Sequence, residues 1–382
     1  MQYVQFGRHD IQASRLGFGT MRLPTKKEGE KTVIDRPEAI SLIRRGIDGG
    51  ISYVDTAYMY HDGESEIVTG LALKEGYRER VQLTTKLPPW FCNEEADLNK
   101  LLDEQLKKLD VAYLDNYLLH ALNRDTFQKM KSFHYQDFMK QALKDGRIRR
   151  AGFSFHDNYD AFMTILNDWD GWDLCQIQFN YLDDREQATV EGLREAGKRG
   201  VAVIIMEPLR GGALANPPKN VTEMIAGYEK QRSAVEWAFA YIADHPEVST
   251  ILSGMSTGEQ LEDNLRIFDT LTVNGLTDKE RAFCAALKEA YLSRMPVRCT
   301  GCAYCQPCPQ DVHIPGIFRP YDQSKMFDDP RRFQREYAGL IEKGFDASRC
   351  VQCGSCESVC PQHISIIDWL QTIDGEYKAM AK

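Results

Sequence analysis

Short apolar segments alternate with amphipathic segments along most of this 382-residue chain. Eight of the apolar segments are rich in Val, Ile, Leu and aromatic residues and have the length of a single strand. In most of the segments between them, the apolar residues have helical spacing. One of these segments begins near Pro37 and ends at Gly49, and proline favours the start of a helix and glycine its end. The eight apolar segments are RLGFGTM, ISYVDTAY, VQLTTK, YLDNYLLH, RRAGFSFH, LCQIQFNYL, VAVIIMEPL and VSTILSGM.

Eight strand–helix repeats predict an α/β fold of the (β/α)8, or TIM, barrel type. A doubly wound sheet is the alternative, but that fold usually carries a G-x-G-x-x-G loop after its first strand, and GFGTMRLP does not match it. Further helical segments follow the eighth strand, and cysteine-rich runs come after them. We therefore predict a barrel domain over residues 1–290 and a small helical, cysteine-rich domain over residues 291–382.

The composition and charge of the chain argue against several kinds of partner and against a membrane span. Apolar residues make up 43% of the chain and charged residues 27%, as in ordinary globular proteins. The net charge of −9 argues against nucleic acid or anionic lipid as a partner. The longest aliphatic run, VAVIIM, is far shorter than the roughly 20 residues of a membrane span. The first residues also lack a signal-peptide pattern, so we expect a cytoplasmic protein without membrane or nucleic-acid partners.

Eleven cysteines in such a chain are better explained as metal ligands than as disulfides. The run CVQCGSCESVCPQ has the spacing C-x2-C-x2-C-x3-C-P, which bacterial ferredoxins use to hold [4Fe-4S] clusters. Tetrahedral zinc is the alternative, although zinc sites usually take two ligand pairs from separate turns. The earlier run, RCTGCAYCQPCPQ, is one residue shorter in its last step.

Two such runs predict two clusters, which makes the second domain an α-helical, ferredoxin-like iron–sulfur domain. In two-cluster ferredoxins the fourth cysteine of each run binds the cluster of the other run. A single cluster on the second run is the competing interpretation, and a purely structural role for the metal is also open. The crossed arrangement predicts one cluster on Cys299, Cys302, Cys305 and Cys360, and another on Cys350, Cys353, Cys356 and Cys308.

Titratable side chains stand where three consecutive predicted strands end. Asp55 closes the second strand, with Tyr60 in the loop that follows, Lys86 closes the third strand and His120 the fourth. Active sites of barrels lie at these carboxyl ends. A lysine beside a phenol favours the phenolate and so makes the tyrosine a better acid. This group suits delivery of a proton to a carbonyl oxygen while hydride arrives at carbon.

The segment DTAYMYHDGESEIVTGLAL resembles the signature of the aldo-keto reductases, and TTK and LDNYLLH resemble their lysine and histidine motifs. This resemblance implies that Tyr60 is the general acid, that Asp55 and Lys86 tune it, and that His120 orients the carbonyl. It also implies that NADP or NAD binds across the barrel mouth. The cofactor contacts that it implies are Gly19, Thr20, Met21, Asp55, Ser154, Gln176, Met206, Leu209, Asp263 and Asn264.

The chain departs from the family pattern at three places. Phe155 stands where an Asn usually follows the carboxamide-binding Ser, and Met206 replaces the aromatic residue that commonly stacks on the nicotinamide. The segment SGMSTGEQ carries no cation for a 2′-phosphate, so the preference for NADPH is weakened and NADH becomes a candidate.

The leading hypothesis is therefore an NAD(P)H-dependent oxidoreductase that interconverts a small carbonyl and an alcohol and carries [4Fe-4S] clusters. One alternative is electron transfer through the clusters, between the nicotinamide or substrate and an external redox partner protein. Another is a regulatory barrel without turnover, which the complete set of four catalytic residues disfavours.

Overall fold

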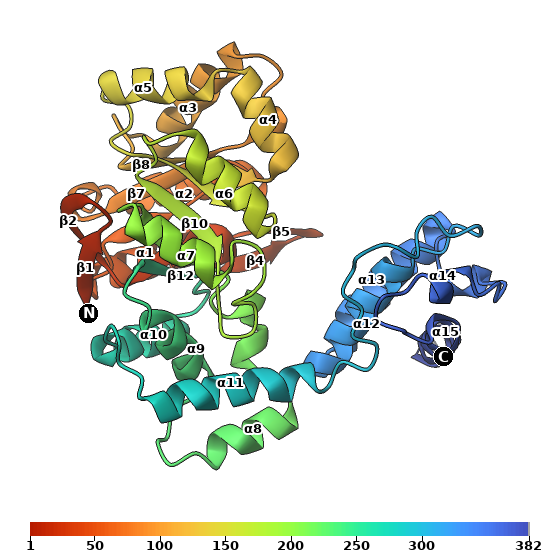
Figure 1. Ribbon diagram of the computed structural model, residues 1–382. Helices are drawn as coiled ribbons and strands as arrows, with labels where there is room; N and C mark the ends of the chain where they lie inside the picture. Colours follow the sequence, from red (N-terminus) through yellow and green to blue (C-terminus); the bar gives the residue numbers. More distant parts are fainter. Residues whose placement is uncertain (381–382) are drawn as a thin grey trace. The chain divides into compact units, whose positions relative to one another are not determined.

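The computed structural model describes residues 1–380 of the chain (Figure 1). The chain divides into two compact units, which are described separately. The first contains Met1–Gly211 and Val235–Arg281, and the second contains Gly212–Ala234 and Ala282–Lys382.

The first unit is a closed barrel of eight parallel strands, and the eight predicted apolar segments supply them. The strands follow one another in chain order, and the last pairs with the first through Ile251 and Leu16. The predicted (β/α)8 barrel is thus confirmed. The strands are β3 (Leu16–Gly19), β6 (Tyr53–Asp55), β7 (Gln82–Leu87), β8 (Asn116–Leu122), β9 (Ala151–Phe155), β10 (Leu174–Gln178), β11 (Ala202–Met206) and β12 (Val248–Ser253).

Amphipathic helices cover the barrel, as their apolar spacing predicts. In α1, for example, Leu42 and Ile43 are fully buried, Pro37 lies in the first turn, and the helix ends at Gly49. The helices of this unit are α1 (Arg36–Asp48), α2 (Glu64–Ala72), α3 (Ala96–Leu109), α4 (Arg124–Ser132), α5 (Tyr135–Lys144), α6 (Tyr159–Asp168), α7 (Thr189–Lys198), α9 (Ala234–Ala243) and α10 (Gly258–Thr270).

Two antiparallel hairpins accompany the barrel and are not among the predicted strands. The first joins β1 (Tyr3–Phe6) to β2 (His9–Ser14), and its Phe6 stacks on the buried ring of Tyr53. The second joins β4 (Thr25–Glu28) to β5 (Lys31–Ile34) and lies in the connection from β3 to α1. That connection leaves the carboxyl end of β3, which is the end of the barrel where active sites form.

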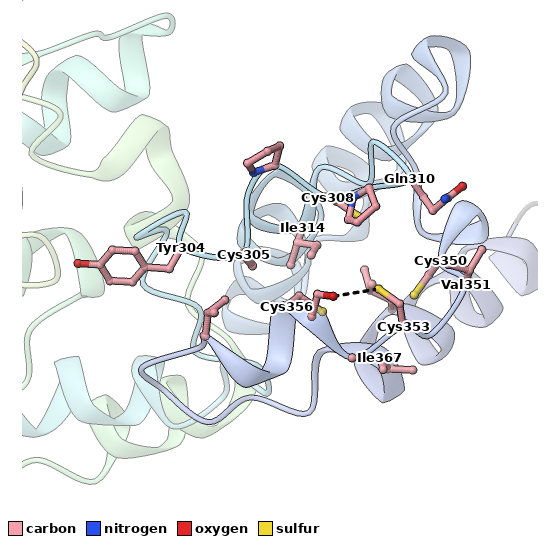
Figure 2. A pocket seen from close by; sticks show the side chains of 16 residues that line it. Tyr304, Cys305, Cys308, Gln310, Ile314, Cys350, Val351, Cys353, Cys356 and Ile367 are labelled. Atoms are coloured by element: carbon pink, nitrogen blue, oxygen red, sulfur yellow. Dashed lines mark hydrogen bonds between the residues drawn. The ribbon is translucent and has the colours of Figure 1, made fainter.

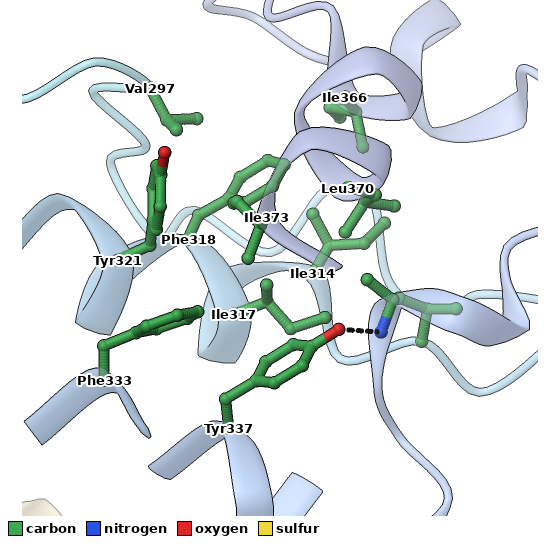
Figure 3. Packing of buried hydrophobic residues seen from close by; sticks show 12 residues of the cluster. Val297, Ile314, Ile317, Phe318, Tyr321, Phe333, Tyr337, Ile366, Leu370 and Ile373 are labelled. Carbon is green, nitrogen blue, oxygen red and sulfur yellow. Dashed lines mark hydrogen bonds between the residues drawn. The ribbon is translucent and has the colours of Figure 1, made fainter. Parts of the chain in front are cut away.

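The second unit has a hydrophobic core of its own (Figure 3). Phe318, Tyr321, Phe333 and Tyr337 form its aromatic part, and six of the clustered cysteines pack against it. The Tyr337 hydroxyl accepts a hydrogen bond of 3.2 Å from the backbone N–H of Ala347. The helices are α8 (Lys219–Ala226), α11 (Asp278–Leu292, of which this unit contains the part from Ala282 on), α12 (Ile314–Phe327), α13 (Pro330–Lys343), α14 (Ser355–Ser358) and α15 (Ile366–Met380).

The segment Gly212–Ala234 groups with this second unit, although the sequence places it within the predicted barrel domain. The amide of Asn220 in α8 donates to the carbonyl of Ala290 in α11 at 3.2 Å, and the ring of Tyr228 stacks on Phe283. These contacts fasten the segment to α11. The division after Arg281 falls close to the predicted boundary at residue 290, which stays a prediction about independent domains.

Within residues 1–380, none of the helices is both long enough and apolar enough to cross a membrane.

The close packing of α2 on α3 gives a stability prediction. A methyl group on Gly70 would lie 2.3 Å from the backbone oxygen of Leu109, so Gly70→Ala must force the two helices apart. We expect the free energy of unfolding to fall by about 1–3 kcal/mol in chemical denaturation. Gly339→Ala in α13 is the control, because nothing lies within 4 Å of its added methyl group. It should instead stabilise its helix by about 0.5–1 kcal/mol, and equal effects of the two substitutions would contradict the packing argument.

Candidate active site

A buried ion pair lies at the centre of the predicted catalytic group. The Nζ of Lys86 donates to Oδ1 of Asp55 at 2.6 Å and to the backbone oxygen of Thr56 at 2.8 Å. The lysine side chain is fully buried and that of Asp55 is 3% exposed. The third Nζ contact is with the Tyr60 hydroxyl, at 3.5 Å. The structure therefore joins three of the four predicted catalytic residues through one ammonium group.

Hydroxyl groups fix the backbone around this ion pair. The Oγ1 of Thr20 donates to the carbonyl of Asp55 at 3.0 Å and lies 2.8 Å from the Oγ of Ser65, which is 3.0 Å from the Oγ1 of Thr56. All of these side chains are buried. The end of β6 is thus tied both to the segment after β3 and to the first turn of α2, which limits the freedom of Asp55.

The protonation states follow from burial and from the central charge. Burial acts to lower the pKa of Lys86, but the charges of Asp55 and Tyr60 outweigh it and the pKa is raised. Burial raises the pKa of Asp55 while Lys86 opposes that shift. Burial likewise raises the pKa of Tyr60, and Lys86 acts in the opposite direction. We expected Lys86 to make the phenol more acidic; its influence has that sign, but desolvation outweighs it, so Tyr60 carries its proton.

His120 lies on an irregularity of β8 that turns its side chain toward Tyr60. The pairing of β8 with β9 shifts between Leu119 and Leu122, and Ala121 adopts a left-handed conformation with φ 50°. The N–H of Ala121 donates to the Oγ of Ser154 at 2.7 Å. The His120 and Tyr60 rings meet edge to face at a centroid distance of 6.1 Å. The bulge therefore completes the predicted set of four residues.

The surroundings of His120 favour its neutral imidazole. Burial lowers its pKa far below the usual value, and Lys86 and His156 add to the effect. Its Nδ1 is buried and has no hydrogen-bond partner among the described residues. A neutral imidazole can donate one hydrogen bond to a carbonyl oxygen without competing for the phenolic proton.

Apolar side chains stand beside this group at the barrel mouth. The ring of Trp90, in the loop after β7, lies 5.2 Å from the ring of His120, and its Nε1 lies 2.8 Å from the sulfur of Met59. Phe91 packs on Tyr58 at 5.6 Å. Trp90, Phe91 and Met59 are all exposed, so they present an apolar wall to whatever binds next to His120.

The predicted cofactor contacts come from strands, from the segments after them and from one helix. Within strands lie Gly19, Asp55, Ser154, Gln176 and Met206; Thr20 and Met21 follow β3, Leu209 follows β11, and Asp263 and Asn264 lie in α10. Ser154 in β9 pairs with Gln176 in β10 in the sheet register. The Oε1 of Gln176 is buried without a partner among residues 1–380, and its Nε2 lies 3.8 Å from the sulfur of Met206. An unsatisfied buried acceptor at the mouth fits the amide hydrogens of a carboxamide, as predicted for a nicotinamide.

The remaining predicted cofactor contacts differ in their exposure and in the hydrogen bonds that their side chains already make. Gly19 and Thr20 are buried at the end of β3, whereas Met21 is 57% exposed, and Leu209 is half-buried beyond β11. In α10 the carboxylate of Asp263 accepts a 2.7 Å hydrogen bond from Arg266. The buried amide of Asn264 donates to the Oγ of Ser253, so this residue fastens α10 to the end of β12.

The clustered cysteines line two cavities in the second unit. Figure 2 shows the larger one, with a volume of about 190 Å3, between the loops of the two runs. The hydroxyl of Ser355 lies 3.6 Å from the sulfur of Cys353 at its edge. Within residues 1–380, no three His, Cys, Asp or Glu side chains converge as ligands of a single ion. The larger cavity is lined by Cys305, Cys308, Cys350, Cys353 and Cys356, and the smaller, of about 20 Å3, by Cys299, Cys302, Cys305 and Cys360.

This division of the thiols fits the crossed ligand sets that the spacing predicts. Cys308 of the first run lies with Cys350, Cys353 and Cys356, and Cys360 of the second run lies with the thiols of the first. Cys305 borders both cavities. The backbone N–H groups of Val297 and Cys299 donate to the buried carboxylate of Asp322, which fixes the start of the first loop.

Sequence comparison assigns both units. The model of the aldo/keto reductase family matches residues 15–281, which is more than half of the chain. The chain belongs to the aldo/keto reductase family. This aldo/keto reductase is therefore an oxidoreductase, and its residues 298–365 match the 4Fe-4S dicluster domain.

Individual relatives agree with this assignment. The aldo/keto reductase is 29% identical over 263 residues to methylglyoxal reductase YeaE of Escherichia coli (strain K12), covering 65% of this chain and 83% of the relative. It is 25% identical over 339 residues to the NADH-specific methylglyoxal reductase of the same strain, covering 76% and 99%.

Solved structures show the same barrel. Aldo-keto reductase AKR11C1 from Bacillus halodurans, in its holo form, is 24% identical and matches with a TM-score of 0.61 over 75% of this chain and 96% of that protein. An aldo-keto reductase from Klebsiella pneumoniae in complex with NADPH, also 24% identical, matches with a TM-score of 0.60 over 75% and 95%.

Sequence reasoning missed two arginines of the barrel mouth. Arg22 is the first cation after the end of β3, and only that position in the sequence points to it. Arg45 belongs to α1, yet a methyl group on Gly258 at the start of α10 would lie 2.8 Å from its guanidinium. No local pattern in the sequence announces such a contact. Arg45 is paired with Glu262 at 2.6 Å.

The neutral state of His120 predicts a pH dependence of stability. An unfolded histidine protonates near pH 6.5, whereas folded His120 does not, so the unfolded state binds more protons as the pH falls below that value. Stability is thus lost toward low pH. His120→Asn should therefore reduce the fall in unfolding free energy between pH 7.5 and 5.5 in denaturant titrations.

The control is His134→Asn. Glu95 raises the pKa of His134, so this residue favours the folded state at low pH. His134→Asn should therefore increase the fall in unfolding free energy between pH 7.5 and 5.5, whereas His120→Asn should reduce it. The same slope in wild type and His120→Asn would show that His120 is not held neutral.

Proposed function

We propose that this aldo/keto reductase reduces a small carbonyl compound to an alcohol with NADH or NADPH, and catalyses the reverse reaction. The observation that carries this proposal is the single ammonium group of Lys86, which contacts both Asp55 and Tyr60 at the barrel mouth. Protonated Tyr60 and neutral His120 then face the same opening. An acid and a hydrogen-bond donor on one oxygen are what carbonyl reduction requires.

In this mechanism, the Tyr60 hydroxyl donates its proton to the carbonyl oxygen of the substrate. Lys86 stabilises the phenolate that remains, and Asp55 holds the ammonium group in place. His120 donates a hydrogen bond to the same oxygen and fixes its direction. A bound nicotinamide would supply the hydride to the carbonyl carbon. Ser154 and Gln176 would hold its carboxamide, and the buried Oε1 of Gln176, which has no partner among the described residues, supports this assignment.

We propose that both dinucleotides serve as cofactors. The segment between β12 and α10 offers no cation to a 2′-phosphate, and Glu262 already pairs with the nearby Arg45. A phosphate without a free guanidinium loses much of its binding preference. The relative that is named an NADH-specific methylglyoxal reductase adds support.

The substrate that fits is small and partly apolar. Trp90 lies against His120, and Met59 lies against Trp90. These side chains leave an apolar wall beside the two donors. Both Escherichia coli relatives are methylglyoxal reductases, and a short carbonyl of that kind matches the position of the wall.

For the second unit we propose two [4Fe-4S] clusters with crossed ligands, one on Cys299, Cys302, Cys305 and Cys360 and the other on Cys350, Cys353, Cys356 and Cys308. Sulfur ligands from two loops would join the loops to the common core, so that metal binding stabilises the unit.

Cluster-linked electron transfer to a partner protein is the second candidate function. Cys302 and Cys353 are the exposed members of their sets. Each of these two residues would therefore bring its own cluster near the surface of the unit, where a redox partner can approach.

Tyr60→Phe tests the proposed chemistry. We expect kcat for methylglyoxal reduction to fall by about 100-fold or more, because general acid catalysis is lost. The dissociation constant for NADH, followed by fluorescence quenching, should stay unchanged. Tyr58→Phe is the matched control, since its hydroxyl donates to Glu104 rather than to the central lysine. Full turnover in Tyr60→Phe would refute the role of this residue.

Iron content and single-cysteine variants test the clusters. The anaerobically purified protein should contain about eight iron atoms per chain. Cys308→Ser should give the same residual electron paramagnetic resonance spectrum as Cys353→Ser, and Cys360→Ser the same as Cys302→Ser. A Cys308→Ser spectrum that matches Cys302→Ser would show that each run holds its own cluster, and about four irons in the wild type would leave one cluster.

A further inference from the structure

The side chain of Arg22 crosses the carboxyl ends of two strands at the barrel mouth. A methyl group placed on Gly254, just after β12, would lie 3.3 Å from the Cβ and Cδ of Arg22. A methyl group on Gly211, in the loop after β11, would lie 3.3 Å from its Nη2. The aliphatic stem therefore lies along Gly254 and the guanidinium reaches Gly211.

The order of the strands explains this path. β3 pairs with β12, and β12 pairs with β11. A long side chain that leaves the end of β3 must pass over β12 to reach the loop after β11. The backbone there is held, because the Oγ of Ser256 donates to the carbonyl of Arg22 at 2.6 Å. Any side chain at Gly254 or Gly211 would crowd this path.

The guanidinium is unpaired in the described part of the chain. Across residues 1–380 it makes no side-chain hydrogen bond and no ion pair within 4.0 Å. Other arginines around the mouth are neutralised, as Arg45 is by Glu262 and Arg266 by Asp263. The Oε2 of Glu207 is also near Gly211, at 3.7 Å from the same methyl position, but it does not pair with Arg22.

This place in a barrel is the usual position for a phosphate group. In (β/α)8 barrels, phosphates are often held by the loops after the seventh and eighth strands and by the helix start beyond them. Here these elements are the loops after β11 and β12 and the start of α10. A guanidinium binds a phosphate through two parallel hydrogen bonds, which makes arginine well suited to this task.

We propose that Arg22 binds the pyrophosphate of the dinucleotide cofactor and is the residue that gives the site its affinity for either NADH or NADPH. The assignment rests on the proposed function. We assign Arg22 to the pyrophosphate rather than to the 2′-phosphate because its guanidinium lies beside Gly211, close to Glu207. The charge of Glu207 is close enough to raise the pKa of Tyr60, so this part of the mouth is near the reacting centre.

The experiment compares wild type, Arg22→Gln and Arg22→Lys by fluorescence titration with NADH and with NADPH. Arg22→Gln should raise both dissociation constants about tenfold or more, since a charged hydrogen-bonding group is lost. Arg22→Lys keeps the charge but not the two-pronged geometry, so it should recover part of the affinity. The salt dependence of binding should be weaker in Arg22→Gln than in wild type.

Lys31→Gln is the matched control, because Lys31 is an exposed cation of the same connection between β3 and α1 and lies in β5. It removes one positive charge and should leave both constants unchanged. Unchanged binding in Arg22→Gln would overturn the assignment. A loss confined to NADPH would overturn it in favour of the 2′-phosphate. A wild type that binds neither dinucleotide would overturn the proposed function together with the assignment.

Discussion

The ion pair between Lys86 and Asp55 is the constraint on which the proposed active site depends. Two charges that are almost fully buried are tolerable only when they are paired and well bonded, and Lys86 meets this demand through Asp55 Oδ1 and the Thr56 carbonyl. Removal of one partner would leave the other charge buried and alone, at a cost of about 3–5 kcal/mol. The same ion pair therefore affects both the stability of the fold and the proposed proton transfer, because its ammonium group also faces Tyr60.

The barrel brings these groups together from distant parts of the sequence. Parallel strands deliver Asp55, Lys86 and His120 to one end, and the segment after β6 adds Tyr60. Local irregularities then adjust the geometry. The left-handed backbone of Ala121 redirects β8 just after His120, and Ser154 holds that turn from β9. A regular strand would continue straight through this position, so the bulge is a feature of the site rather than a defect.

Much of this could be predicted from the sequence because buried parallel strands are continuous apolar runs, and because a barrel fixes the edge at which its polar strand ends meet. The hairpin of β4 and β5 was not predictable in the same way, since TKKE is exposed at every position and has no apolar period. Arg22 was missed because its proposed role follows from the order of strands in space. The raised pKa of Tyr60 was also missed, because it depends on burial that no local pattern reports.

The second unit is organised around its cysteine loops rather than around a sheet. Its aromatic core lies against the cysteine loops, and thiols from both runs gather around each cavity. The spacing of the runs predicts crossed ligand sets, which stay a prediction, and it could not predict that Gly212–Ala234 would group with this unit. That segment is distant in sequence, and its attachment depends on contacts such as Asn220 with Ala290.

The most direct test of the account is a single-turnover measurement on the double variant Asp55→Asn/Lys86→Met. This variant removes both buried charges together, so it does not leave one of them unpaired. With bound NADH and methylglyoxal, the rate of NADH oxidation should fall by about 100-fold or more relative to wild type, while NADH still binds. A rate equal to that of the wild type would contradict the claim that this ion pair enables Tyr60 to deliver the proton.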